Sequence, residues 1–161
     1  MHKISLVLLS ICLQASDIRI SEVMSNPAGS EYENEFIEIF NASEGVIHIN
    51  GWVLTDGSGV DTLSYLSGPV EIEPRGYALI MDPGYDFLGG PYAGIIPDSI
   101  PLYTLSTDAS FGSGGLANSG EMVRIYAPDS TSWDEMSWSV STDNGFSWER
   151  ENMDSPDSLV I

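Results

Sequence analysis

Acidic side chains in glycine-rich loops are the residues of this chain best suited to chemistry. Asp56 and Asp61 bracket one such loop, and Asp82 and Asp86 lie in a second loop that is rich in glycine and proline. Ca²⁺ prefers oxygen ligands, and a flexible loop can wrap several carboxylates around the ion. Neither loop has the spacing of an EF-hand. The sequence therefore indicates calcium as a candidate cofactor, with solvated acidic loops as the alternative.

Catalytic groups of the common kinds are scarce. His48 is the one histidine after residue 15, and its neighbours Ile47 and Ile49 place it in a strand-like run. No serine occupies a Gly-x-Ser-x-Gly elbow, and ordinary zinc sites need several His or Cys side chains. Carboxylate pairs suited to glycoside hydrolysis are abundant, but no motif singles one out. We predict that the protein is not an enzyme, and the sequence assigns no catalytic, cofactor-binding or metal-ligating residue.

Aromatic side chains in loops and at strand ends suggest a second kind of ligand. Tyr85, Tyr92, Trp133 and Trp148 offer flat faces that suit a carbohydrate ring. The alternative is that these rings belong to the hydrophobic core, as we expect for Trp138.

The charge balance excludes one class of partner. The chain has 24 acidic residues, and from residue 16 onward these face only four arginines and no lysine. Such a surface repels phosphate backbones and anionic lipid heads. We therefore expect no nucleic acid partner, and a protein or a glycan at a cell surface remains as the partner.

Residues 1–15 have the layout of a secretory signal peptide. A short basic start precedes an apolar run over residues 4–13, which is too short to cross a bilayer, and a small residue follows at Ala15. Cys12 is the only cysteine and leaves with this segment. We expect a secreted or cell-surface protein without disulfides and without membrane insertion after cleavage.

Short strands separated by turns account for the rest of the chain. No long helical pattern follows the signal peptide, and alternating apolar runs bounded by Gly, Pro, Asn and Asp predict an all-β, antiparallel β-sandwich. The predicted strands cover residues 17–24, 35–41, 46–56, 62–66, 70–72, 77–81, 103–105, 122–126, 132–140 and 146–150. Within residues 122–126, Val123 and Ile125 are expected to point inward, and Arg124 and Tyr126 outward.

Residues 34–56 read as the central hairpin of this sandwich. Its two runs, 35–41 and 46–56, are joined by a short turn that contains a glycine. Ile49 and Trp52 cannot share a face unless one residue is inserted between them, so we predict a β-bulge at Asn50 and Gly51. Apolar residues flank Glu38 on both faces of the first run. We therefore expect Glu38 to be half-buried and paired, with Arg150 as the first choice of partner.

Several motifs occur in an order that resembles a known family. They read Ile-x-Ile-x-Glu-Val at 18–23, Asn-Pro at 26–27, Glu-Phe-Ile-Glu-Ile-x-Asn at 35–41, Ile-x-Gly-Trp-x-Leu-x-Asp at 49–56, Pro-x-Gly-Tyr at 74–77, Gly-Leu-x-Asn-x-Gly-Glu at 115–121 and Gly-x-Ser-Trp-Glu-Arg at 145–150. Residues 17–150 thus resemble the lamin tail domain family, specifically its bacterial secreted members. The resemblance implies an immunoglobulin-like β-sandwich that acts as a non-catalytic module. Eukaryotic members are associated with DNA and chromatin, and this chain lacks the basic patch that such binding needs.

The expected organisation is a signal peptide over residues 1–15, one domain over residues 17–150 and a tail over residues 151–161. The tail ends in an apolar tripeptide, which suggests that it continues into a longer polypeptide. We predict a secreted, non-catalytic binding or architectural module. The alternative is an accessory domain, dependent on carbohydrate or calcium, that targets a larger secreted hydrolase to its substrate.

Overall fold

The computed structural model describes residues 17–154 and 159–160, so the predicted signal peptide lies outside the described residues. All regular structure in this part of the chain is strand, and no helix in it is long and apolar enough to cross a membrane. The strands are β1 (Ile18–Met24), β2 (Phe36–Asn41), β3 (Val53–Thr55), β4 (Val60–Ser67), β5 (Tyr77–Met81), β6 (Leu102–Leu105), β7 (Glu121–Tyr126), β8 (Trp133–Trp138), β9 (Trp148–Arg150) and β10 (Leu159–Val160).

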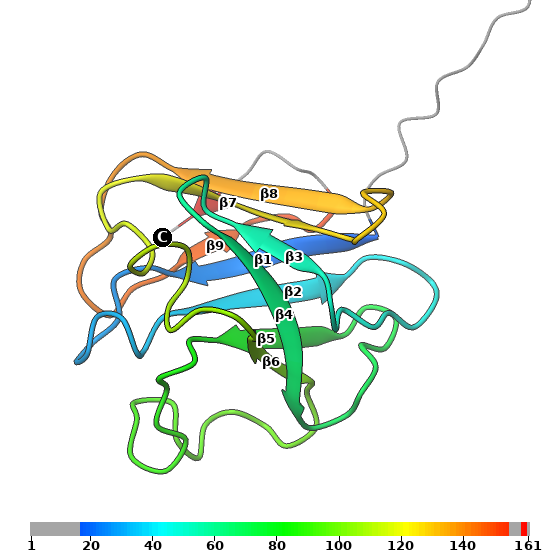
Figure 1. Ribbon diagram of the computed structural model, residues 1–161, viewed down its shortest axis with the longest axis horizontal. Helices are drawn as coiled ribbons and strands as arrows, with labels where there is room; N and C mark the ends of the chain where they lie inside the picture. The colour runs from blue at the N-terminus through cyan, green and yellow to red at the C-terminus, as the bar shows by residue number, and fades with distance from the viewer. Residues whose placement is uncertain (1–16, 155–158, 161) are drawn as a thin grey trace, which may run out of the picture.

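One continuous sheet folds over into two layers that face each other (Figure 1). The strand order is β10-β9-β1-β2-β5-β6-β4-β3-β7-β8. The first layer holds β9, β1, β2, β5 and β6, and the second holds β3, β7 and β8 (Figure 1). The long strand β4 crosses in front of the first layer and joins the two, because it pairs with β6 along one edge and with β3 along the other. The predicted immunoglobulin-like β-sandwich is confirmed.

One strand pair departs from the predicted antiparallel pattern. β5 and β6 run parallel, with Leu79 beside Leu102 and Ile80 beside Tyr103. Parallel neighbours need a long crossover connection, and residues 82–101 supply it. This segment is the long loop expected from its glycine and proline content.

The predicted central hairpin is wrong. β2 pairs with β1 on one side and with β5 on the other, so no edge of β2 is left for residues 46–56. The Asn41 amide ties the chain after β2 to the carbonyl oxygens of Gly45, Ile72 and Glu73 instead. The second run of the predicted hairpin shrinks to β3, which pairs with β4 and β7.

The bulge predicted at Asn50 and Gly51 forms one residue further along the chain, at Gly51 and Trp52. Gly51 donates a backbone hydrogen bond to Leu63 O at 2.8 Å, and Leu63 N donates to Trp52 O at 2.8 Å. Two residues on one side therefore oppose a single residue on the other, which defines a bulge. Gly51 has φ of 81°, a conformation that glycine adopts without steric cost. The inserted residue lets both Ile49 and Leu54 reach the core, where both are buried.

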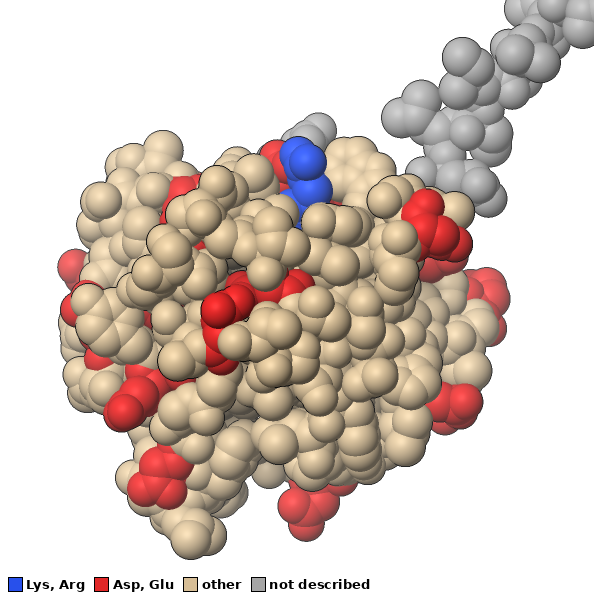
Figure 2. Space-filling model, viewed as in Figure 1, with Lys and Arg blue, Asp and Glu red and all other residues tan. Residues whose placement is uncertain are grey.

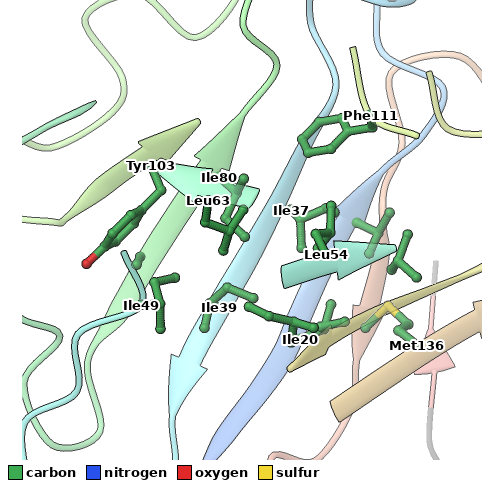
Figure 3. Packing of buried hydrophobic residues seen from close by; sticks show 14 of the residues in the cluster. Ile20, Ile37, Ile39, Ile49, Leu54, Leu63, Ile80, Tyr103, Phe111 and Met136 are labelled. Carbon is green, nitrogen blue, oxygen red and sulfur yellow. The ribbon is translucent and has the colours of Figure 1, made fainter. Parts of the chain in front are cut away.

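The main hydrophobic core fills the space between the two layers (Figure 3). Each fully buried aliphatic or aromatic side chain stabilises the fold by roughly 1.5–3 kcal/mol relative to its exposed state. The labelled core side chains are Ile20, Ile37, Ile39, Ile49, Leu54, Leu63, Ile80, Tyr103, Phe111 and Met136. The core side chains of β2 lie on one of its faces.

The other face of β2 contributes to a second, smaller core. Phe36 packs there with Met24, Met81 and Tyr85, and the loop of residues 82–101 adds partly buried side chains on top. β2 is therefore covered on both faces, as expected for a central strand.

A buried ion pair closes the seam between the two layers. Arg150 Nη2 donates to Asp134 Oδ2 at 2.7 Å, and Arg150 Nε donates to Ile20 O at 2.9 Å. The same Asp134 oxygen accepts the backbone N–H of Ile20 at 2.8 Å, beside the register shift between Ile20 and Glu22 in β1. Asp134 and Arg150 thus bind β8 and β9 to β1 where the regular strand ladder is interrupted.

Glu38 is half-buried and paired, but the predicted choice of Arg150 as its partner is wrong. Ser21 Oγ donates to Glu38 Oε1 at 2.7 Å. Burial raises the pKa of Glu38, the Ser21 hydrogen bond opposes this effect, and the neighbouring Glu22 raises the pKa further. Arg150 points into the seam toward Asp134, whereas Glu38 and Glu22 are direct cross-strand neighbours.

Candidate functional site

The two acidic loops do not assemble the calcium site that the sequence suggested. Asp56 Oδ1 accepts the backbone N–H groups of Ser58 and Gly59, and Asp56 Oδ2 accepts the Ser58 hydroxyl. Asp86 is exposed and accepts the backbone N–H of Leu88. In the described residues, no three His, Cys, Asp or Glu side chains lie together in a way that could hold a metal ion. Asp56 and Asp86 instead stabilise their own loops.

A glycine-rich segment lies over a set of buried carboxylates. This segment, residues 111–120, is called the glycine-rich crossing below. Gly112 N donates to Asp61 Oδ2 at 2.9 Å, and Leu116 N donates to Glu35 Oε2 at 2.9 Å. Ala117 N donates to Glu121 at 2.8 Å. The backbone of the crossing therefore supplies the donors that these carboxylates need in a chain with few cations.

Two glycines allow this close approach. A Cβ atom at Gly112 would lie 1.7 Å from Asp56 Oδ2, and a Cβ atom at Gly115 would lie 2.6 Å from the ring of Tyr32. Both glycines also have positive φ, of 54° and 86°. Any larger residue at either position would push the crossing away from the carboxylates.

Three buried carboxylates under the glycine-rich crossing each have one oxygen atom without a hydrogen-bond partner among the described residues. These atoms are Glu35 Oε1, Asp61 Oδ1 and Asp82 Oδ2. Burial, with a smaller contribution from the neighbouring carboxylates of Asp82, Glu121 and Glu31, raises the pKa of Glu35 to about 8, although the hydrogen bond from Leu116 lowers it. Burial likewise raises the pKa of Asp61 and of Asp82 to about 6. These raised pKa values favour the protonated form of Glu35, Asp61 and Asp82.

Three of the four aromatic residues predicted to contact carbohydrate belong to the packed interior. Tyr85 is buried and stacks on the half-buried Tyr92, with ring centroids 5.6 Å apart. Trp148 is also buried. Trp133 alone of the four is largely open to solvent, with 53% of its surface exposed.

Trp133 borders an open pocket of about 470 Å³ on the outer face of the second layer, the face turned away from the main core. The pocket is lined by Thr55, Arg124, Tyr126, Ser130 and Trp133, and we call it the outer-face pocket. The strand register places these residues: Thr55 lies beside Arg124, and Tyr126 lies beside Trp133. Arg124 and Tyr126 point outward, as their alternation with the buried Val123 and Ile125 predicted.

Arg124 combines two interactions at the pocket. Its guanidinium lies 5.4 Å from the centroid of the Trp133 ring, and its Nε donates to Glu135 Oε2 at 2.9 Å. A cation over an indole face is attracted by the ring, and a guanidinium pairs well with a carboxylate. The aromatic surface and the Arg124–Glu135 ion pair are therefore held next to each other.

Ser130 brings a hydroxyl group to the pocket at some conformational cost. It ends the turn between β7 and β8 with φ of 57°, and its backbone N–H donates to Ala127 O at 2.8 Å. A non-glycine residue in this region costs on the order of 1 kcal/mol. Glycine would fit the turn with less strain, and serine in its place supplies a hydroxyl to the pocket lining.

Figure 2 shows how charge is distributed over one face of the molecule. Asp and Glu side chains are scattered over the visible face, and little Lys or Arg surface appears among them. The sequence identified Arg124, Tyr126 and Trp133 as outward or flat-faced residues. It did not show that the turn before β8 adds Ser130 or that β3 adds Thr55, because those contacts depend on strand pairing.

The two packed layers and the open pocket define the class of this protein as a single immunoglobulin-like β-sandwich domain with a small outer-face cavity. A comparison with protein families matches residues 13–140 to the Lamin Tail Domain. The chain therefore belongs to the lamin tail domain family, a family of non-catalytic immunoglobulin-like domains. No curated protein matches the chain.

Proposed function

We propose that the protein is a secreted, non-catalytic binding module of the bacterial type and that it binds its partner through the outer-face pocket. The observation that supports this proposal is the exposure of Trp133 next to Arg124 on an otherwise acidic molecule. Large apolar rings are usually buried, and an exposed ring that lines a pocket with polar groups is a common feature of binding sites.

Secretion is tested first, with the full chain. Expression from its own start codon should release protein into the medium, with an N-terminus at Ser16 determined by peptide mapping. Retention inside the cell with Met1 intact would contradict the secreted assignment.

Binding is then tested with fluorescently labelled secreted protein and intact cells of the organism that produces it. We expect saturable binding that falls at least tenfold in Trp133→Ala. The matched control is Phe146→Ala, because Phe146 is exposed to a similar extent, 57%, and does not line the pocket. Equal binding by both variants and the parent protein would contradict the proposed function.

The second candidate, a targeting domain for a larger secreted hydrolase, would use the same pocket. The two candidates differ in genetic context, so the reading frame beyond Ile161 separates them. A catalytic domain encoded there in frame favours the targeting role, and its absence favours an independent module.

A further inference from the structure

The outer-face pocket combines a flat aromatic surface with paired hydrogen-bond donors and acceptors. Trp133 lies beside Tyr126, its direct cross-strand neighbour, with the Arg124 guanidinium over its ring and 53% of its surface exposed for a ligand. Apolar C–H groups on one face of a sugar ring pack against such a surface, and the indole ring is the largest that a protein can offer. The aromatic part of the pocket thus suits a ring with an apolar face and a polar edge.

The polar part of the pocket suits hydroxyl groups. Arg124 offers N–H donors, and its partner Glu135 offers carboxylate oxygens a short distance away. A sugar hydroxyl both donates and accepts, so an adjacent pair of this kind can satisfy two neighbouring hydroxyls at once. Ser130 adds a hydroxyl-bearing side chain to the lining, whereas the Thr55 hydroxyl is bound within its own turn, where it donates to Gly59 O and accepts from Gly57 N.

The charges argue against an anionic ligand. Glu135 already neutralises Arg124, so the pair attracts an anion less than an unpaired guanidinium would. The chain carries 24 acidic residues, so its overall field opposes the approach of negative charge. A neutral ligand meets neither obstacle.

The volume of the pocket also suits a small-molecule ligand. Its volume of about 470 Å³ lies within the range of roughly 300–1,000 Å³ that small-molecule sites occupy.

We propose that the outer-face pocket binds a neutral saccharide, with one sugar ring stacked on Trp133 and its hydroxyls bound by the Arg124–Glu135 pair. This inference rests on the proposed function and specifies its ligand class. Ser130 holds a hydroxyl at the rim of the pocket despite its strained backbone.

The test uses purified full-length secreted protein and soluble neutral oligosaccharides whose linked sugars all keep a periodate-sensitive diol: the β-1,4-linked tetramers of glucose, xylose and mannose. Calorimetry and tryptophan fluorescence should detect binding of at least one of them, and trigalacturonate, an anionic counterpart, should bind more weakly. Trp133→Ala should weaken binding at least tenfold and remove the fluorescence change, whereas Phe146→Ala should leave both unchanged. Glu135→Gln, which keeps the shape of the side chain, should also weaken binding and provides a second variant if Trp133→Ala fails to fold.

Ser130→Gly separates binding from folding. We expect it to keep or raise the thermal midpoint, because strain is relieved, and to lower saccharide affinity, because a hydroxyl is lost. A purely structural role for Ser130 predicts no change in affinity.

Treated cells distinguish failure of this inference from failure of the proposed function. Periodate oxidises sugar diols and should abolish Trp133-dependent cell binding, whereas protease treatment should preserve it. Trp133-dependent binding that survives periodate but not protease would identify a protein partner and overturn the saccharide inference alone. An absence of any Trp133-dependent binding would overturn both proposals, and tighter binding of trigalacturonate than of every neutral tetramer would overturn the choice of a neutral ligand.

Discussion

Replacing Glu35 with glutamine should stabilise the protein at neutral pH and leave its stability at pH 4 almost unchanged. Glu35 is fully buried, and its Oε2 accepts the N–H of Leu116. Glutamine keeps an oxygen for that hydrogen bond and cannot ionise. The substitution therefore removes the cost of a buried charge without removing the contact that holds the glycine-rich crossing.

The sign and the size of this change in the free energy of unfolding follow from the raised pKa of Glu35. Burial raises the pKa of Glu35 from its ordinary 4.5 to about 8 in the folded protein. Below pH 4.5 Glu35 holds its proton in both the folded and the unfolded chain, so its contribution to the free energy of unfolding is fully present. As the pH rises toward 8, the unfolded chain loses the proton first and the free energy of unfolding falls. Linkage gives a loss of roughly 3 kcal/mol at pH 7 and roughly 5 kcal/mol above pH 8.

Urea denaturation at pH 4, 7 and 9 measures this effect, since urea adds no ionic screening. Glu35→Gln should raise the unfolding midpoint over the parent protein at pH 7 and more so at pH 9, with an unchanged m-value. Glu44→Gln is the matched control, because Glu44 is exposed in the turn after β2. A parent protein whose stability does not fall between pH 4 and 9, together with no gain in Glu35→Gln, would refute the reasoning.

Three further substitutions test the framework around the pocket and the crossing. Gly112→Ala should cost at least about 2 kcal/mol in urea denaturation, since its Cβ would overlap Asp56, while Gly114→Ala meets no atom within 4 Å and serves as control. Asp134→Ala should cost roughly 3–5 kcal/mol, because it leaves the buried Arg150 guanidinium without its carboxylate. Asp154→Ala breaks an exposed pair with Arg75 and should cost less than about 1 kcal/mol by the same assay. Equal losses in the Asp134 and Asp154 variants would contradict a structural role for the seam.

The sequence was sufficient for the sandwich because local alternation and turn residues carry that signal. It was also sufficient to place the bulge to within one residue, because a change of face along one strand needs no knowledge of the partner strand. It was insufficient for strand pairing. The 35–41 and 46–56 runs are neighbours in sequence, yet β2 needs two long partners to cover both its edges, and β1 and β5 supply them.

The predicted Glu38–Arg150 pair failed for a related reason. In a chain with few cations, any buried carboxylate is a plausible partner for Arg150, and sequence distance does not rank them. The register shift in β1 decides the pairing, because it leaves the backbone groups of Ile20 for Asp134 and Arg150 to bind. Neither this shift nor the assembly of the pocket from three strands and a turn can be recognised in the local sequence pattern.

The positions of the four arginines connect the acidic composition to the proposed site. Arg19 and Arg150 are buried beside Asp134 in the seam, where a charge must be paired to be tolerated. Arg75 lies over the Phe40 ring, 4.7 Å from its centroid, and pairs with an exposed carboxylate. Arg124 is the arginine in a pocket, held against Trp133 by a carboxylate that cancels its charge. A guanidinium kept in place but electrically neutralised is suited to directional hydrogen bonding rather than to attracting anions, which is the property that binding of a neutral saccharide requires.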